Sequence, residues 1–268
     1  MKNPCKNYLF YVFDNLYLGG GEDYFFFSKL IKNFQMLIGL DLIPNPEYES
    51  KPINFKENIE ELLIKLDKIL GIKIDFPNIF NHEKGLPTTR GIMSTRSLQS
   101  LYFICKMKLI LGDNFKNSSI LEFGAGMGKN AYYAYKMGIK KYTIIDIPET
   151  NIVQSYYLGN ICGNENINLF KENNASVINI LPCNEFDNLN EVFDLIVQFD
   201  GLTEMGKTIA QNYVDKFPNL SEIFFSINHE ANEYTVQDLY KNNENILLKE
   251  RSLSWYREGY VEELLIKR

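Results

Sequence analysis

The sequence predicts an α/β fold: a mostly parallel sheet with flanking helices and an antiparallel closing strand, preceded by a helical N-terminal region. From residue 118 onward, short β-branched runs alternate with helical stretches, which is the order that builds a parallel sheet. Before that point, apolar residues recur at the three- and four-residue spacing of helices. A chain of 268 residues is long enough for this sheet and one helical region.

The first part of the chain is expected to be helical. One helix is predicted over 22–40 and a second over 56–70, which Gly71 ends as a C-cap. A third is predicted over 94–111. Between the second and third helices, the polar segment 81–91 contains Gly and Pro and is predicted to be a loop, a kind of segment that often carries function. These elements give two predicted domains, a helical cap over 1–112 and a sheet domain over 113–268.

The sheet domain is predicted element by element from its alternating patterns. The expected main strands are 119–123, 141–146, 193–199 and 222–227, and the expected helices are 128–137, 149–158, 208–217 and 236–240. Two shorter strand candidates are 167–170 and 176–180, of which only one is expected in the main sheet. The segments 245–250 and 261–267 are predicted to close the sheet as a strand pair.

Composition excludes several classes of function. The formal charge is −6, from 28 basic and 34 acidic residues, whereas nucleic-acid binding requires a basic surface. Four cysteines without a C-x-x-C pair, together with two histidines, argue against a structural zinc site. No segment approaches the ~20 apolar residues of a membrane span, and no signal-peptide cleavage pattern is present. We therefore expect a cytoplasmic protein, and the oligomeric state stays open, a homo-oligomer included.

The clearest motif is the glycine-rich run LEFGAGMG at 121–128, between a predicted strand and a predicted helix. Glycines allow a tight turn and let a ligand lie against bare backbone. The helix that follows points its free N–H groups at the same ligand. Asp146 ends the next strand about 20 residues after Gly124, the spacing of a carboxylate that binds ribose hydroxyls.

Three ligands compete for this turn. A phosphate loop of the Walker type fails because Asn130 follows Gly128-Lys129 where Ser or Thr is required. A dinucleotide fingerprint has its third glycine position occupied by Lys129, which weakens NAD or FAD. S-adenosylmethionine (SAM) carries an amino acid and a ribose instead of a pyrophosphate, and Glu122 suits its ammonium group. On these residues alone, a dinucleotide or a turn without a ligand stays open.

The same residues resemble the class I SAM-dependent methyltransferases, through EFGAGMG at 122–128 and YTIIDIPET at 142–150. More narrowly, FDGLTEM at 199–205 and FSIN at 225–228 are similar to bacterial sugar O-methyltransferases found with surface-polysaccharide and capsule genes. The resemblance covers about residues 90–267. It implies a Rossmann-like methyltransferase sheet, SAM as methyl donor, and a sugar or nucleotide-sugar acceptor. The cofactor-binding residues it implies are Glu122, Gly124, Ala125, Gly126, Gly128, Asp146, Ile147, Asn174 and Asp200.

Two residues are candidates for the catalytic base that a hydroxyl acceptor needs. His229 follows a predicted strand, and an imidazole is largely neutral at pH 7. Asp200 follows the preceding strand and is the second candidate; it could instead hold Mg²⁺ with Glu204 and Glu230, since oxygen ligands suit that ion. A third reading makes Asp200 a helix cap. The metal therefore stays an open alternative.

The predicted acceptor-binding residues come from several segments. His82 is expected to reach over the pocket, and Arg90 to meet a phosphate of a nucleotide-activated sugar. The full set is His82, Arg90, Glu204, Asn228 and Glu230. Alternative functions are an NAD-dependent nucleotide-sugar oxidoreductase, a small-molecule methyltransferase with a non-sugar acceptor, and a non-enzymatic module with the same fold.

Overall fold

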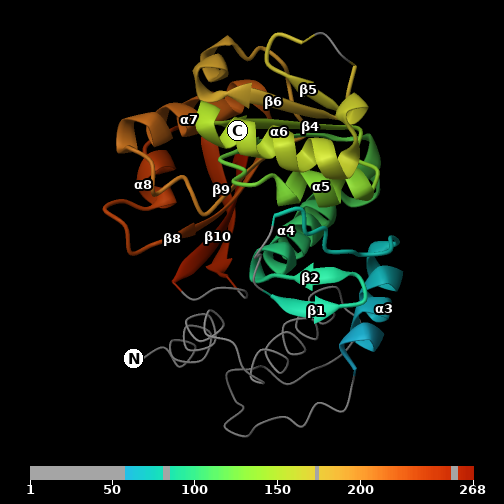
Figure 1. Cartoon of the computed structure of the whole chain (residues 1–268). Helices are drawn as coiled ribbons and strands as arrows, with labels where there is room; N and C mark the ends of the chain where they lie inside the picture. The colour runs from blue at the N-terminus through green and yellow to red at the C-terminus, as the bar shows by residue number, and fades with distance from the viewer. Residues whose placement is uncertain (1–57, 81–84, 173–174, 255–258) are drawn as a thin grey trace, which may run out of the picture. The chain divides into compact units, whose positions relative to one another are not determined.

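A computed structural model describes residues 58–80, 85–172, 175–254 and 259–268 (Figure 1). The chain divides into two compact units, one of residues 1–105 with 256–258 and one of residues 106–255 with 259–268. The predicted helix over 22–40 lies outside the described residues. Within the described ranges, no helix combines the length and the apolar character that crossing a bilayer requires.

In the first unit, the predicted second helix is confirmed as α3, Ile59–Leu70. Asn58 caps its start by accepting a hydrogen bond from the Glu60 amide, and Gly71 ends it in the left-handed conformation with φ 72°. One face of the helix is buried: Ile59, Leu62, Leu63, Leu66 and Leu70. The predicted third helix is confirmed as α4, Thr95–Leu111, which continues into the second unit.

The loop predicted over 81–91 is wrong for its second half. Residues 86–93 form an antiparallel hairpin of β1, Leu86–Thr88, and β2, Gly91–Met93. The Thr88 hydroxyl donates to the Gly91 carbonyl at 2.8 Å, and Gly91 has φ 112°, so the turn is closed by a side chain and a glycine-only conformation. The closely spaced Gly and Pro residues of this segment favoured a loop, whereas the structure shows two short strands joined by a turn.

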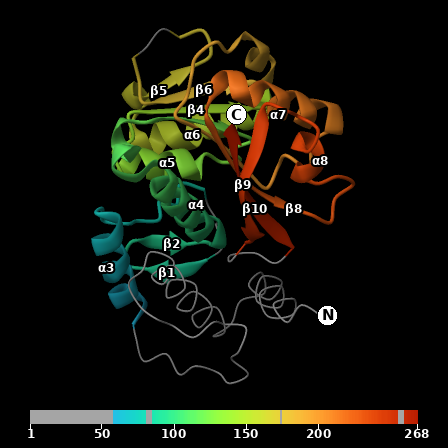
Figure 2. The ribbon, with the colours of Figure 1, turned by 180° about the vertical axis from the view of Figure 1, so that it is seen from behind.

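The second unit contains an eight-stranded sheet in the order β5-β6-β4-β3-β7-β8-β10-β9 (Figures 1 and 2). Its strands are β3 Ser119–Phe123, β4 Lys141–Asp146, β5 Ile167–Leu169, β6 Ile178–Pro182, β7 Leu195–Phe199, β8 Ile223–His229, β9 Ile246–Leu253 and β10 Tyr260–Lys267. The first six in sheet order are parallel, and β10 is antiparallel to both β8 and β9. The predicted α/β fold with a closing antiparallel pair is confirmed.

The expectation that only one short strand joins the main sheet is wrong. Ile178 of β6 pairs with Tyr142 of β4 on one side and with Ile167 of β5 on the other. Both candidates therefore belong to the sheet, and β5 forms its edge. A strand of three residues is too short for its sequence alone to distinguish an edge strand from a loop.

Helices cover both faces of this sheet (Figures 1 and 2). The connections are η2 Gly112–Asn117, α5 Lys129–Lys136, α6 Pro148–Cys162, η3 Asn164–Asn166, η4 Cys183–Asn188, α7 Lys207–Leu220 and α8 Val236–Tyr240. Side chains of a strand alternate between faces. Leu121 and Phe123 point into a core shared with α7 and α8, whereas Glu122 points to the other face and meets Asn130 of α5.

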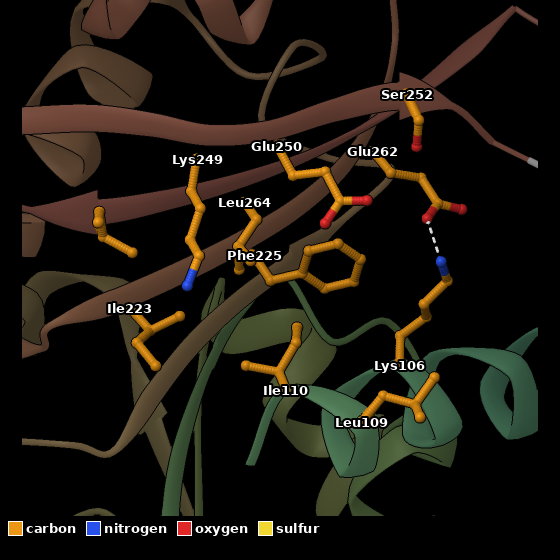
Figure 3. A pocket seen from close by; sticks show the side chains of 11 residues that line it. Lys106, Leu109, Ile110, Ile223, Phe225, Lys249, Glu250, Ser252, Glu262 and Leu264 are labelled. Carbon is orange, nitrogen blue, oxygen red and sulfur yellow. Dashed lines mark ion pairs between the residues drawn. The ribbon is translucent and has the colours of Figure 1, made fainter. Parts of the chain in front are cut away.

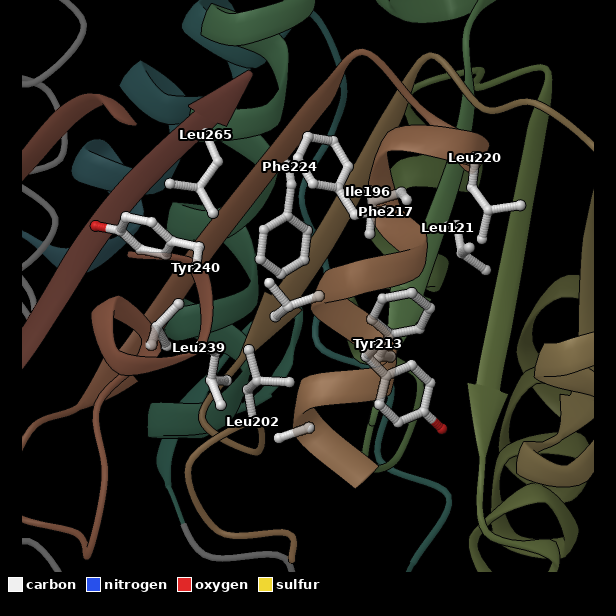
Figure 4. Packing of buried hydrophobic residues seen from close by; sticks show 14 of the residues in the cluster. Leu121, Ile196, Leu202, Tyr213, Phe217, Leu220, Phe224, Leu239, Tyr240 and Leu265 are labelled. Carbon is white, nitrogen blue, oxygen red and sulfur yellow. The ribbon is translucent and has the colours of Figure 1, made fainter. Parts of the chain in front are cut away.

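The core on the α7–α8 side is rich in aromatic rings (Figure 4). Tyr213 of α7 lies 4.5 Å from Phe123 and 4.4 Å from Phe186 between ring centroids. Phe123 is the last residue of β3, so this packing fixes the point at which the chain leaves the sheet. Close aromatic pairs of this kind add stabilisation beyond their buried area.

The strand order reverses between β3 and β7. The strands β4, β5 and β6, which follow β3 in the chain, lie on one side of β3, and the later strands β7 and β8 lie on the other side. In open α/β sheets, ligands bind at such a reversal, outside the carboxyl ends of the strands. Gly124 and Asp200 follow the two strands that flank it. The fold therefore places the glycine turn at the position where this architecture forms a crevice.

Candidate functional site

The glycine turn contains three glycines in the left-handed region, with φ 68° at Gly124, 55° at Gly126 and 81° at Gly128. A Cβ atom added at Gly124 or Gly126 would meet nothing within 4 Å, so open space adjoins the backbone there. At Gly128 it would lie 2.9 Å from a methyl carbon of Leu158. The first two glycines leave room for a ligand, and the third allows α5 to pack closely on α6.

Asp146 stands beside this turn. Its Oδ1 accepts the Ile147 amide at 2.8 Å, and its Oδ2 accepts the Gln154 side-chain amide at 2.8 Å. Burial raises the pKa of Asp146, and hydrogen bonds from Ile147, Gln154 and the backbone amides of Gly126 and Ala125 oppose that rise. The carboxylate is thus fixed against the turn by both main-chain and side-chain donors.

Gln154 was not predicted from the sequence, although it joins the two parts of the motif. Its amide nitrogen donates both to Asp146 and to the Gly126 carbonyl, each at 2.8 Å. The side chain comes from α6 and is fully buried. A buried glutamine within the helix that follows the acid is the signal that could have identified it. Beside it, Ile147 is 52% exposed and presents apolar surface next to Asp146.

Glu122 lies beneath the turn and is 1% exposed. Its two oxygens accept the Asn130 amide at 2.6 Å and the Tyr142 hydroxyl at 2.8 Å. Burial raises its pKa to about 7. In this structure the carboxylate therefore connects β3, α5 and β4 inside the protein, which differs from the expected contact with a cofactor ammonium group.

On the other side of the reversal, Asp200 begins a turn in the left-handed region, with φ 64°. The Asp200 amide donates to the Ile227 carbonyl at 2.9 Å. Two residues on, the Leu202 amide donates to Asn228 Oδ1 at 3.0 Å. A Cβ at Gly201 would lie 2.8 Å from Gln198 Nε2, so only glycine fits there without a shift.

Asn228 was predicted to contact the acceptor, but it is 2% exposed. Its amide nitrogen donates to Gln198 Oε1 at 2.6 Å and to Ser226 Oγ at 3.1 Å. Together with its bond to Leu202, these contacts use the whole side chain to hold the turn after Asp200. In this structure Asn228 is therefore a buried support of the turn after Asp200.

Three side chains meet at the ends of β7, β8 and β10. The Tyr260 hydroxyl donates to Asp200 Oδ1. Tyr260 pairs with His229 across the sheet, and their rings lie 5.0 Å apart at 71°, an edge-on arrangement. His229 Nδ1 accepts the Ala231 amide at 3.0 Å. The structure thus brings the two predicted base candidates, Asp200 and His229, to a common partner, Tyr260.

The other predicted acceptor residues have the following places. Glu230 is exposed and forms an ion pair with Arg251, and Glu204 is exposed. In the first unit, the Arg90 guanidinium donates to Asp67 at 2.8 Å and to the Ile74 carbonyl at 3.1 Å. The Arg90 guanidinium is therefore bound by residues of the first unit. His82 and Asn174 lie outside the described residues.

The magnesium ion that the sequence left open as an alternative does not fit the residues that the structure describes. In the part of the chain that the structure describes, no group of three His, Cys, Asp or Glu side chains could hold a metal ion. Asp200 is bound by Tyr260, and Glu230 is bound by Arg251. Each of these carboxylates already has a protein partner, and no step below uses a metal.

A separate cleft of about 440 Å³ lies between the end of α4 and the strands β8, β10 and β9 (Figure 3). Ile223, Phe225 and Leu264 line it, and the ion pair of Lys106 and Glu262, at 2.8 Å, stands at one side. Ile223 begins β8, whereas His229 ends it. This cleft therefore lies toward the opposite ends of the strands and is distinct from the region around the glycine turn.

No protein-family model and no curated protein sequence matches the chain. Among solved structures, it is similar to magnesium protoporphyrin IX methyltransferase from Synechocystis with bound SAH, with a TM-score of 0.50 and 8% identity over 65% of this chain and 84% of that one. This likeness shows that the chain shares its α/β fold with that methyltransferase.

Two further solved structures are similar at lower TM-scores. One is the ribosomal protein L11 methylase from Lactobacillus delbrueckii subsp. bulgaricus, with a TM-score of 0.47 and 13% identity over 73% of this chain and 90% of that one. The other is mitomycin 7-O-methyltransferase, with a TM-score of 0.43 and 9% identity over 65% of this chain and 57% of that one.

Proposed function

We propose that the protein is a SAM-dependent methyltransferase that methylates a hydroxyl group of a small molecule. The observation that carries this proposal is the open glycine turn joined to Asp146 through Gln154, at the point where the strand order reverses. A ribose-bearing ligand requires a carboxylate beside bare backbone, and these residues provide both. The α/β fold that the chain shares with a solved methyltransferase is consistent with it.

The residues present fit this cofactor in three places. Asp146 would accept hydrogen bonds from ribose hydroxyls, the open backbone at Gly124 and Gly126 would take the methionine part, and Ile147 would contact the adenine. When bound, SAM supplies a methyl group already activated by its sulfonium. The protein then has to position the acceptor and accept its proton.

We further propose that the acceptor is a sugar hydroxyl, free or nucleotide-activated, in surface-polysaccharide synthesis. A sugar hydroxyl is a poor nucleophile and needs a base beside it. Asp200 and His229 end neighbouring strands on the far side of the reversal from Asp146, where an acceptor would face the methyl group. The sugar itself rests on the sequence resemblance at 199–205 and 225–228.

Calorimetric titration with SAM and with S-adenosylhomocysteine (SAH) tests the first proposal. We expect dissociation constants on the order of micromolar, and Asp146→Ala should weaken binding at least ~10-fold, the equivalent of one lost charged hydrogen bond. Asp113→Ala is the matched control, because Asp113 is an exposed acid in η2 before β3. The absence of binding heat from a folded protein would refute the proposal.

The dinucleotide alternative is separated by thermal denaturation with each ligand. A ligand that binds only the folded protein raises its melting temperature. We expect SAH to raise it and NAD to leave it unchanged, because Lys129 occupies the third glycine position of the dinucleotide pattern and is buried at the start of α5. Protection by NAD and not by SAH would replace the proposal with a nicotinamide-dependent oxidoreductase.

A further inference from the structure

The hydrogen bond at His229 decides which of its nitrogens carries the proton. A neutral imidazole has one N–H donor and one acceptor nitrogen. His229 Nδ1 accepts the Ala231 amide at 3.0 Å, so the proton of the neutral ring lies on Nε2. A Cβ at Gly259 would come within 2.9 Å of that Nε2, so the main chain passes close to this side of the ring. His229 therefore presents a donor at Nε2, whereas a base needs a lone pair.

Asp200 is held as an acceptor. The Tyr260 hydroxyl donates to its carboxylate, and the backbone of Asp200 is bound to Ile227 across β8. The turn that follows is held by the buried side chain of Asn228, which accepts the Leu202 amide and donates to Gln198. A carboxylate that receives a phenol hydrogen bond on a fixed turn has a defined direction before any acceptor arrives.

We propose that Asp200 is the general base of the reaction, that Tyr260 is its positioning residue, and that His229 donates a hydrogen bond from Nε2 to the acceptor. This assignment rests on the proposed methyltransferase function. The acceptor O–H bond breaks and its proton passes to the Asp200 carboxylate while the oxygen forms a bond to the methyl carbon. The C–S bond breaks at the same time, its electron pair stays on sulfur, and the products are the methyl ether, SAH and protonated Asp200.

The competing assignment makes His229 the base. It would require the ring to give up the hydrogen bond from the Ala231 amide or to present Nε2 without its proton. The edge-on contact with Tyr260 and the close approach of Gly259 both restrict reorientation of the ring. The charged residues next to this group, Glu230 and Arg251, bind each other. The geometry thus favours Asp200 as the proton acceptor.

A test that needs no acceptor uses nuclear magnetic resonance on the whole protein with SAH as the ligand. The chain has two histidines, and His229→Gln identifies the signals of His229. We expect ¹⁵N shifts of the tautomer protonated at Nε2. We also expect Tyr260→Phe to shift the carboxyl carbon signal of Asp200, because it removes the hydroxyl that donates to this carboxylate. A ring protonated at Nδ1, or an Asp200 carboxyl signal that Tyr260→Phe leaves unchanged, would overturn the proposal.

Tyr240→Phe is the matched control for the carboxyl signal of Asp200. Its hydroxyl also donates to a buried carboxylate, Glu263 Oε1 at 2.7 Å, but on the other face of the sheet. This variant should leave the Asp200 carboxyl signal unchanged. If the wild-type protein does not bind SAH, the methyltransferase function fails, while the tautomer and the carboxyl signal still decide the roles of His229 and Asp200.

Turnover is measured as SAH formation with a panel of UDP-hexoses and free hexoses. With any member that is methylated, Asp200→Asn should lower kcat ~100- to 10,000-fold, the size of a general-base contribution. His229→Gln keeps an amide donor and should lower kcat less than ~10-fold. Tyr260→Phe should lower kcat and leave KM nearly unchanged, because it removes the hydroxyl that positions Asp200, and Tyr240→Phe should change neither. A loss in His229→Gln as large as in Asp200→Asn would contradict the assignment.

Discussion

The proposed ligand-binding region has two halves, and each is held by a buried amide side chain. In the cofactor half, Gln154 joins the Gly126 carbonyl to Asp146. In the acceptor half, Asn228 joins the turn after Asp200 to β7 through Gln198. Both amides are nearly inaccessible, with 0% exposure for Gln154 and 2% for Asn228. The two loops that would face the ligands are thus both fixed from inside the protein.

The halves differ in how far apart their partners lie in the sequence. Gln154 follows Asp146 by a separation of 8 residues, whereas Tyr260 reaches Asp200 over a separation of 60. The first half is assembled by one β-α-β-α run. The second half requires β10 to pair with β8 before its side chains meet. The cofactor half therefore depends on local structure, and the acceptor half depends on completion of the whole sheet.

The largest expected effect compares two glycines of the same turn. Gly128→Val should lower the free energy of unfolding by roughly 2–4 kcal/mol, because overpacking against Leu158 adds to the cost of a left-handed backbone. Gly126→Val meets open space and carries only the backbone cost, about 1–2 kcal/mol. Urea unfolding measures both. Equal losses in the two variants would show that Gly128 has no special packing role.

The second prediction concerns pH. Burial raises the pKa of Glu122 from 4.5 to about 7, so the folded state binds its proton more tightly than the unfolded state. Its contribution to stability is present below pH 4.5 and is lost as the pH rises through 7, an effect on the order of 3 kcal/mol. Glu122→Gln cannot titrate, and its free energy of unfolding should fall less than that of the wild type between pH 5 and pH 8.

Glu191→Gln provides the control for this measurement. Glu191 is an exposed carboxylate paired with Lys141 at 2.6 Å, so its substitution should leave the slope of stability against pH unchanged. A wild type and a Glu122→Gln variant with parallel pH profiles would mean that Glu122 keeps an ordinary pKa in the folded protein.

Much of the cofactor half could be predicted from the sequence, because its signals are local. The glycine spacing, the strand before it and the acid after the next strand all occur within 119–146. The direction of a side chain is harder to predict, because it depends on partners from other elements. Glu122 is predicted to bind the cofactor ammonium group, and in the structure Asn130 and Tyr142 donate hydrogen bonds to its carboxylate.

The acceptor half could be predicted only in part. Asp200 and His229 were found as polar residues at strand ends, but nothing near them in the sequence indicates Tyr260. The contact of Tyr260 with Asp200 arises from the register in which β10 pairs with β8, and this register is set by tertiary structure. The inward direction of Asn228 follows from the same pairing, since one step along a strand exchanges the two faces.

The third prediction tests the support of the acceptor half. Asn228→Ala removes the acceptor for the amide of Leu202, a residue with 0% exposure, and leaves that donor buried without a partner. The cost should be about 1–3 kcal/mol in urea unfolding. Asn232→Ala is the control: Asn232 is exposed and donates to Thr203 Oγ1 at 2.9 Å, so its loss leaves no buried donor without a partner and should cost less than Asn228→Ala. SAH affinity should be nearly unchanged in both, because the cofactor half is intact.

The smallest expected effect comes from the amide of the cofactor half. Gln154→Leu keeps the volume of the side chain but removes its bonds to Asp146 and the Gly126 carbonyl, at a stability cost of about 1 kcal/mol. SAH affinity should fall roughly tenfold, because Asp146 loses a donor that fixes its direction. Gln211→Leu, which removes a glutamine bonded to the Leu239 carbonyl on α8, should leave SAH affinity unchanged. Calorimetry on both variants decides whether Gln154 orients the ribose carboxylate: an unchanged affinity in Gln154→Leu would mean that the glycine turn and the Ile147 amide are sufficient to hold it.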